Sequence, residues 1–353
     1  MLTGGPGILS TIGATPLVEL VRLFPDSPIR VYAKLEGFNP AGSIKDRPAL
    51  SMLGDLIRTG DLVPGESVVV ESSSGNLGIG LAQVCRYYGL RFICVVDPRA
   101  NKQNIGIMRA LGAEVEMVTE PDRESGDYLP ARVARVRDLT LTVPGAYWPN
   151  QYGNSLNALA HRTTMREIDE ALPGSLDYLI CSASSCGTLR GCADYIRAHR
   201  LPVEIVAVDA LGSAIFDPSP PRVSRLLPGH GASTRPPLHT PDLADSVVHV
   251  GDLDCVTGCR RLAATEAILA GGSSGAVVSA LDGLSHVIPD GSTCVMVLPD
   301  RGERYLSTIY NDAWVAENFG RVPRPHDLPA NLPTDLPADL PTVSTMEKIS
   351  CSS

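Results

Sequence analysis

The chain has 353 residues, enough for about two domains of ordinary size, and 44% of them are hydrophobic while 20% are charged. The formal net charge of −9, without a long basic run, argues against a nucleic-acid partner. No apolar run approaches the ~18 residues of a membrane span, and residues 1–9 lack the charged start and apolar stretch of a secretory signal, so we expect a cytoplasmic protein without a membrane partner.

Nine cysteines raise the question of a metal site or disulfides. Cys255 and Cys259 lie four residues apart, and Cys181 and Cys186 five apart, but neither pair has His or Cys partners at zinc spacing. A cysteine in an apolar run, such as Cys94, behaves as a small core residue. We therefore expect reduced thiols and no metal.

Short apolar strands alternate with helical patterns along the chain. In the first half, strands are predicted at residues 31–35, 67–70, 92–96 and 115–118, with helices at about 44–58, 77–88 and 101–111. In the second half, strands are predicted at 178–181, 205–208, 247–250 and 294–298, with helices at about 155–171, 189–199, 256–269 and 276–284. This alternation indicates parallel sheets covered by helices on both faces.

The end of the chain has a different character, because Leu-Pro pairs recur between residues 327 and 342. Repeated prolines prevent helices and sheet ladders. We predict that residues 321–353 form a disordered or extended tail, with docking on a partner as the alternative.

Lys45 lies in the segment NPAGSIKDR (residues 39–47), between a predicted strand and a predicted helix. The small residues leave room for a flat cofactor against the backbone, and Ser43 is a candidate N-cap for the helix. A lysine near a helix start is usually only a solvated charge. The choice between these interpretations depends on the rest of the chain.

Four further segments rich in glycine or serine accompany Lys45. They are GATPL (residues 13–17), ESSSGNLG (71–78), SASSCGT (182–188) and GGSSG (271–275). Backbone N–H groups at a helix start bind anions, which suits residues 71–78 to a substrate carboxylate and residues 182–188 to a phosphate. Taken alone, residues 13–17 would be only a loop signal, residues 71–78 could be a serine-rich helix cap, and residues 271–275 could be a loop and N-cap. The glycines after residue 74 lack the Gly-x-Gly-x-x-Gly order of dinucleotide-binding folds.

Taken together and in this order, the segments resemble the cysteine synthase and cystathionine β-synthase family, whose members use pyridoxal 5′-phosphate (PLP). The resemblance covers about residues 8–310, including LPDRGERY at residues 298–305. It implies the α/β fold of fold-type II PLP enzymes (tryptophan synthase β-like), with two doubly wound α/β domains and PLP in the cleft. The implied parts are an N-terminal crossover of the larger domain (1–41), a smaller substrate-clamping domain (42–150) and the larger PLP-binding domain (151–320).

The resemblance also implies roles for single residues. Lys45 would hold PLP and then serve as general base for the α-proton of the substrate, which requires a lowered pKa. Asn76 would contact the 3′-oxygen of PLP, and Ser273 its pyridine nitrogen, where a hydroxyl favours β-elimination over transamination. The cofactor phosphate would be bound by the loop residues Ser184, Ser185, Cys186, Gly187 and Thr188. The substrate would be bound by Ser73, Ser74, Gly75, Asn76 and Gln151.

This sequence departs from most family members at two places. Residues 184–188 read SSCGT where relatives have GTGGT, and residues 151–154 read QYGN where relatives have QFxNP. With Arg132, these features resemble the branch that makes N-(2-amino-2-carboxyethyl)-L-glutamate on the way to 2,3-diaminopropionate, a siderophore and antibiotic precursor. That branch implies elimination of phosphate from O-phospho-L-serine to an α-aminoacrylate, followed by addition of the amine of L-glutamate.

A phosphate leaving group calls for a cation and extra hydroxyls, and we predict Arg132, Tyr152 and Ser185 in this role. Two alternatives stand beside this assignment. Arg132 could belong to a solvated basic helix face with Arg135 and Arg137, and Tyr152 could be a core aromatic residue.

Three functions remain open on the sequence alone. The first is the phosphoserine- and glutamate-using synthase, and the second is a cysteine synthase using O-acetylserine or O-phosphoserine with sulfide. The third is a non-catalytic scaffold with the PLP-enzyme fold, against which the retention of Lys45, Asn76 and Ser273 argues. The family resemblance also implies a homodimer.

Overall fold

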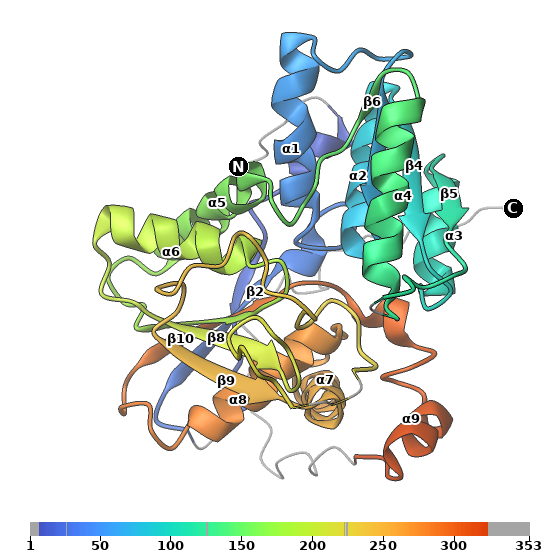
Figure 1. Cartoon of the computed structure of the whole chain (residues 1–353). Coiled ribbons are helices and arrows are strands. Elements are labelled where there is room, and N and C mark those ends of the chain that lie inside the picture. The colour runs from blue at the N-terminus through green and yellow to red at the C-terminus, as the bar shows by residue number, and fades with distance from the viewer. Residues whose placement is uncertain (1–6, 26, 125, 222, 224, 324–353) are drawn as a thin grey trace, which may run out of the picture.

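Two sheets of different size, each flanked by helices, make up the structure (Figure 1). The computed structural model describes residues 7–323, except residues 26, 125, 222 and 224. The predicted Leu-Pro-rich tail therefore lies outside the described residues from residue 324 onward. Within the described ranges, no helix is both long enough and apolar enough to cross a membrane.

The larger sheet has the strand order β1-β2-β10-β7-β8-β9. Its strands are β1 (Leu17–Glu19), β2 (Arg30–Leu35), β7 (Tyr178–Ser182), β8 (Glu204–Ala210), β9 (Ser246–Val250) and β10 (Thr293–Leu298). All neighbours are parallel except β1 with β2. β10 is buried along its whole length, as a central parallel strand should be. β1 was not predicted, because three partly exposed residues carry no detectable pattern.

The helices of the larger sheet cover both of its faces. They are α5 (Ser155–Ala171), α6 (Gly187–His199), α7 (Asp252–Glu266) and α8 (Gly272–Leu284), with the short α9 (Asp312–Phe319) nearby. Alternate residues of one strand separate the two faces: Val295 packs with the α5 and α6 side, and Met296 with the α7 and α8 side. α7 and α8 pack so closely that a Cβ on Gly258 would lie 2.2 Å from the carbonyl oxygen of Gly275.

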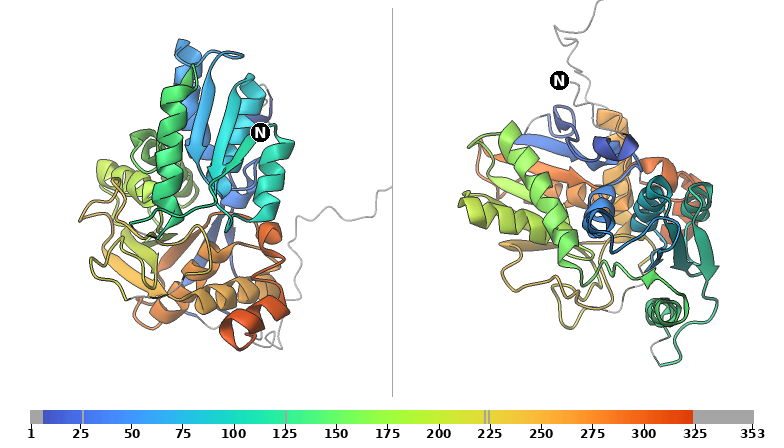
Figure 2. Two further views of the ribbon diagram at one scale, coloured as in Figure 1. Left: turned by 45° about the vertical axis from the view of Figure 1, so that its right-hand side comes forward. Right: turned by 90° about the horizontal axis from the view of Figure 1, so that it is seen from above.

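The smaller sheet has the order β5-β4-β3-β6, and all of its pairs are parallel. Its strands are β3 (Val68–Ser72), β4 (Arg91–Val96), β5 (Glu114–Met117) and β6 (Ala146–Tyr147). Its helices are α1 (Asp46–Thr59), α2 (Asn76–Tyr88), α3 (Lys102–Ala110) and α4 (Tyr128–Thr142). Val69 faces the core with α1, α2 and α3, and Val70 faces α4, so this sheet is also covered on both sides (Figure 2).

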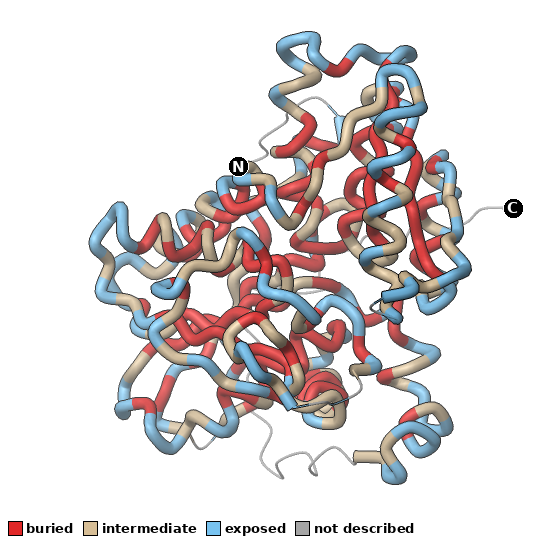
Figure 3. The backbone as a smooth tube through the Cα atoms, viewed as in Figure 1, coloured by how far each residue is buried: buried red, intermediate tan, exposed pale blue. Residues whose placement is uncertain are grey.

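The chain passes between the two sheets twice. It leaves the larger sheet after β2 through a 3₁₀ turn (Glu36–Phe38) and enters α1, and it returns from β6 to α5. The four-stranded unit is thus inserted between β2 and β7 of the six-stranded sheet. Figure 3 shows that the central strands of both sheets are buried, whereas loops and the outer sides of helices are exposed. The predicted α/β fold class is confirmed.

Several helix starts differ from the prediction. α1 begins at Asp46, so the prediction of Ser43 as its N-cap is wrong: the N-cap position is Lys45, and Ser43 Oγ instead accepts a hydrogen bond from the Lys45 N–H (3.2 Å). α7 and α8 begin four residues before the predicted positions. Their first turns follow Gly251 and Gly271 and, apart from Leu253, hold small or acidic residues, so the predicted apolar pattern starts only in the second turn.

Candidate active site

A cavity of about 690 Å³ opens where β3, β7 and β10 end, so segments from both sheets line it. The carboxyl ends of parallel strands are the usual place for a ligand in α/β folds. Lys45, Asn76 and Ser273 all line this cavity. The other predicted site residues that line it are Ser73, Ser74, Gly75, Arg132, Gln151, Tyr152, Ser184, Ser185, Cys186, Gly187 and Thr188. Segments more than 200 residues apart in sequence therefore meet in one place.

The amine of Lys45 has no hydrogen-bond partner among the residues that the structure describes. Desolvation by burial lowers its pKa, while the negative charge of Asp300 and the thiol of Cys186 act in the opposite direction. The backbone of Lys45 packs closely against α2, as a Cβ on Gly80 of that helix would lie 3.1 Å from the Lys45 carbonyl oxygen. A lysine with these properties is suited to nucleophilic and acid–base chemistry.

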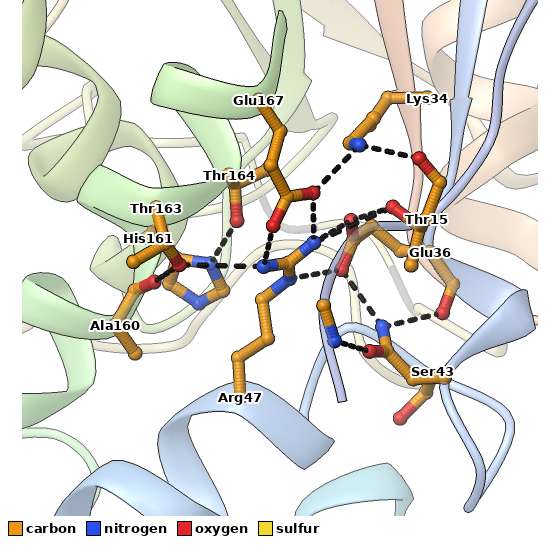
Figure 4. A network of polar contacts seen from close by, with 12 residues as sticks. Thr15, Lys34, Glu36, Ser43, Arg47, Ala160, His161, Thr163, Thr164 and Glu167 are labelled. Carbon is orange, nitrogen blue, oxygen red and sulfur yellow. Dashed lines mark hydrogen bonds and ion pairs between the residues drawn. The ribbon is translucent and has the colours of Figure 1, made fainter. Parts of the chain in front are cut away.

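A largely buried network of charged groups surrounds Arg47 in the first turn of α1 (Figure 4). Arg47 donates to both carboxylate oxygens of Glu36 (2.7 and 2.8 Å) and to both of Glu167 (2.7 Å each). Lys34 pairs with Glu167 (2.7 Å) and donates to the carbonyl oxygen of Thr15 (2.6 Å). Burial favours neutral Glu167, but the Arg47 and Lys34 contacts prevail and hold the pKa of Glu167 at about 2. The network connects the GATPL segment, the start of α1 and α5.

The segment after β3 is held by its own hydroxyls. Ser73 Oγ accepts from the N–H of Gly78 (3.0 Å) and so satisfies one N–H of the first turn of α2, whose N-cap residue is Gly75. Ser74 Oγ accepts instead from Arg132 (3.3 Å). Asn76 donates from Nδ2 to Asp300 Oδ2 (2.7 Å) and accepts at Oδ1 from Arg304. The first turn of α2 is thus fixed from both sides of the cavity.

Glu71 is a buried carboxyl group in the cavity wall. It accepts from Trp148 Nε1 (2.9 Å) and from the backbone N–H groups of Ser72 (2.8 Å) and Gln151 (3.3 Å). Burial raises its pKa to about 7, against the effect of these hydrogen bonds. Glu71 therefore connects the end of β3 with the chain crossing that carries Gln151 and Tyr152.

The loop between β7 and α6 is held in place by a side chain of α5. Asn157 of α5 donates to Ser185 Oγ (3.3 Å) and to the Gln151 carbonyl oxygen (2.8 Å), which connects two predicted site segments. A Cβ on Gly187 would lie 2.3 Å from Asn157 Oδ1, so a larger residue here would displace the Asn157 side chain. Cys186 adopts a left-handed conformation (φ 65°) at a position where most relatives have glycine, and its thiol is buried.

Arg132 faces the cavity from α4. Its side chain is only 11% exposed, and it pairs with Asp97 (3.3 Å) besides its bond to Ser74. The alternative of a solvated basic face is therefore wrong for Arg132. That alternative describes Arg135 better, since Arg135 pairs on the surface with Glu116, whereas Arg137 also lines the cavity. Burial raises the pKa of Tyr152, with Arg132 acting in the opposite direction.

Three residues that matter in this geometry had no predicted role. Asp300 and Glu71 lie in the segments LPDRGERY and ESSSGNLG, so only the segments, and not these carboxylates, drew attention. Asn157 lies in a helix with no signal in the sequence that distinguishes it from a surface amide.

The residues present fit PLP. The cavity has the size of a cofactor site, Lys45 offers a free amine, and the loop before α6 offers backbone N–H groups and hydroxyls for a phosphate. A lysine facing such a cradle between two α/β units defines the class of fold-type II PLP enzymes. The prediction of this class is confirmed by the comparisons with known proteins.

The chain belongs to the family of pyridoxal-phosphate dependent enzymes, whose model matches residues 8–300. It is 47% identical over 310 residues to an N-(2-amino-2-carboxyethyl)-L-glutamate synthase of Ralstonia nicotianae, covering 88% of this chain and 90% of that protein. Its structure is similar to that of an O-ureido-L-serine synthase, with a TM-score of 0.80, 33% identity and coverage of 88% of this chain and 99% of the other. An O-acetylserine dependent cystathionine beta-synthase from Helicobacter pylori matches with a TM-score of 0.79, 29% identity and coverage of 88% and 100%. The protein is therefore a PLP-dependent synthase, as predicted.

Proposed function

We propose that this synthase replaces the phosphate of O-phospho-L-serine with the amine of L-glutamate. The products would be N-(2-amino-2-carboxyethyl)-L-glutamate and phosphate, and the first of them would supply 2,3-diaminopropionate for a siderophore or antibiotic. The name of the 47% identical relative supports this product. The observation that carries the choice of phosphoserine is Arg132, a mostly buried cation at the cavity beside the Ser74 hydroxyl.

In this proposal, different residues of the chain bind the cofactor, transfer the proton and bind the substrate. PLP, when bound, would withdraw electrons from the α-carbon of the substrate. Lys45 would hold the cofactor and then carry the α-proton, which its lowered pKa permits. Backbone N–H groups from Ser73 to Asn76 would bind the substrate carboxylate, assisted by Gln151. Arg132, with Tyr152 and Ser185, would bind the departing phosphate.

The cofactor would be bound by groups from three loops. Residues 184–188 at the start of α6 would hold its phosphate, and the Ser273 hydroxyl at the start of α8 would face its ring nitrogen. The buried position of Ser273 in the cavity wall is consistent with that role.

We propose further that residues 42–150 act as the smaller domain, 151–320 with 1–41 as the larger, and that the smaller closes over the substrate. The sheet order supports this division, because β1 and β2 pair with strands from the second half of the chain. A homodimer and a cytoplasmic location complete the proposal.

The test uses the full chain loaded with PLP. Phosphate release from O-phospho-L-serine is measured with and without L-glutamate, and the product is identified by mass spectrometry. We expect the mass of N-(2-amino-2-carboxyethyl)-L-glutamate to appear only when both substrates are present.

The competing function is cysteine synthesis from O-acetylserine, a substrate on which one structural neighbour, a cystathionine beta-synthase, depends. The same preparation is therefore given O-acetylserine and sulfide. Cysteine formed with a kcat/KM above that of the phosphoserine and glutamate reaction would overturn the proposal.

A further inference from the structure

Asp300 is a buried carboxylate at the end of β10 that also lines the cavity. Its Oδ2 accepts two hydrogen bonds, from Asn76 Nδ2 (2.7 Å) and from the Tyr305 hydroxyl (2.6 Å). Its Oδ1 has no hydrogen-bond partner among the described residues, and it lies so close to Gly271 that a Cβ there would be 2.1 Å away. Among the charged groups, Asp300 has the largest effect on the pKa of Lys45, which it raises against the effect of burial.

Arg304 holds the other end of the same amide. It is buried, and it donates to Asn76 Oδ1 and to the carbonyl oxygen of Ala41, just before Lys45. The carbonyl oxygen of Arg304 accepts from Asn101 Nδ2 (2.7 Å), the N-cap residue of α3. Arg304 is thus fixed between two loops of the four-stranded unit and cannot easily turn away from Asn76.

These two partners define which way the Asn76 amide points. A guanidinium can only donate hydrogen bonds, so Arg304 requires an acceptor opposite it. On the other side, Asp300 Oδ2 accepts from Asn76 Nδ2, although burial raises the pKa of this carboxyl group. The amide oxygen must therefore face Arg304, and the amide nitrogen must face Asp300. The flipped amide would put N–H groups against the guanidinium and oxygen against the carboxylate. Since the nitrogen carries two hydrogens and Asp300 takes one, one N–H remains.

We propose that Asp300 is a positioning residue, which together with Arg304 fixes the Asn76 amide so that its remaining N–H is available to the phenolic oxygen of PLP. This oxygen is on the ring carbon next to the one that carries the aldehyde group of PLP. Since the Lys45 amine would bond to that aldehyde carbon, the oxygen would lie close to Lys45. The proposal rests on the proposed cofactor contact of Asn76, but not on the identity of the substrates.

The experiment removes the carboxyl acceptor with Asp300→Asn. The PLP dissociation constant is measured by titrating the apoprotein, and the visible absorption spectrum of bound PLP is recorded without substrates. We expect weakening of about tenfold, the loss of roughly one hydrogen bond, and a shift of the absorption maximum, because the phenolic oxygen is conjugated with the ring. Asn76→Ala should cause the same shift.

The double variant carries the decisive comparison. If Asp300 acts through Asn76, then Asp300→Asn combined with Asn76→Ala should bind PLP no more weakly than Asn76→Ala alone. Additive losses, or an unchanged spectrum in Asp300→Asn, would overturn the proposal. If the two losses in PLP binding were additive, Asp300 would act independently of Asn76, as a negative charge that pairs with Lys45.

Two further variants test whether the Asp300→Asn substitution acts only by disturbing the local structure. Tyr305→Phe removes the other hydrogen bond to Asp300 Oδ2 but leaves Asn76 paired, so its spectrum should match that of the parent. If Asp300→Asn does not fold, as judged by circular dichroism, Arg304→Gln tests the same orientation from the oxygen side and should shift the spectrum. Because no substrate is present, a failure of the phosphoserine and glutamate proposal would leave these readouts unaffected.

Discussion

Arg47 and Glu167 form a two-pronged ion pair, with Nη1 to Oε1 and Nη2 to Oε2 both at 2.7 Å, that joins the first turn of α1 to α5. Lys45 precedes α1 directly. The pair therefore holds the lysine segment against the larger sheet, although neither residue lines the cavity.

The first prediction concerns this pair. Glu167→Gln should lower the free energy of unfolding at pH 7 by roughly 2 kcal/mol, because it leaves the Arg47 and Lys34 charges poorly paired. The measurement is urea unfolding of the apoprotein. Glu170→Gln is the control on the same helix, since its pair with Arg166 is long and exposed, and it should change little.

The effect of Glu167 should depend on pH in a defined direction. Its pKa in the folded protein is about 2, below the ordinary value of 4.5. The stabilisation of the folded protein by ionised Glu167 is therefore complete above a pH of about 4.5 and is lost as the pH falls toward 2. The difference between parent and Glu167→Gln should shrink on acidification, and a difference that grows instead would contradict the assignment.

The second prediction tests the phosphate-binding role of Arg132. Arg132→Met should reduce kcat/KM for O-phospho-L-serine by about 100-fold, because a charge-assisted contact to the departing phosphate is lost. PLP binding should be retained. Arg135→Met on the same helix is the control, as Arg135 pairs with Glu116 away from the cavity. Equal losses in both variants would point to damage to α4 rather than to a lost substrate contact.

The third prediction concerns Glu71. Its pKa of about 7 lies above the ordinary 4.5, so the folded protein retains a proton that the unfolded chain has lost between these values. The free energy of unfolding should therefore fall as the pH rises from about 4.5 to 7, by roughly 1–3 kcal/mol from this group.

Glu71→Gln cannot ionise, so it should show a weaker fall over the same range. Asp46, whose pKa is also raised to about 7, contributes equally to both proteins and cancels in the difference. If the free energy of unfolding fell equally with pH in parent and variant across this range, the raised pKa of Glu71 would be refuted.

The fourth prediction addresses covalent attachment of the cofactor. Borohydride reduction of the PLP-loaded protein should fix PLP on Lys45, as detected by peptide mass spectrometry. Lys45→Ala should show no such adduct and should lose at least about 10³-fold in activity. Lys102→Ala, at the exposed start of α3, serves as the control and should behave like the parent.

Much of the fold and site could be read from short local patterns. Lys45, the glycine- and serine-rich turns and the apolar strands each have a signature within about ten residues. The contacts that fix them do not, because Arg47 and Glu167 are 120 residues apart and Asn76 and Asp300 are 224 apart. Nothing in the sequence around Asn157 indicates that its amide connects Gln151 to Ser185. Burial also decides protonation, so the unusual pKa of Glu71 could not be derived before its surroundings were known.

The two chain crossings between the sheets have a mechanical consequence. Residues 36–45 lead into the four-stranded unit and residues 148–154 lead out of it, and they are its covalent connections to the six-stranded unit. Lys45 lies on one, and Gln151 and Tyr152 lie on the other. A rotation of the inserted unit would therefore displace the Lys45 amine and the segment with Gln151 and Tyr152 together, so both shift with any change in its orientation.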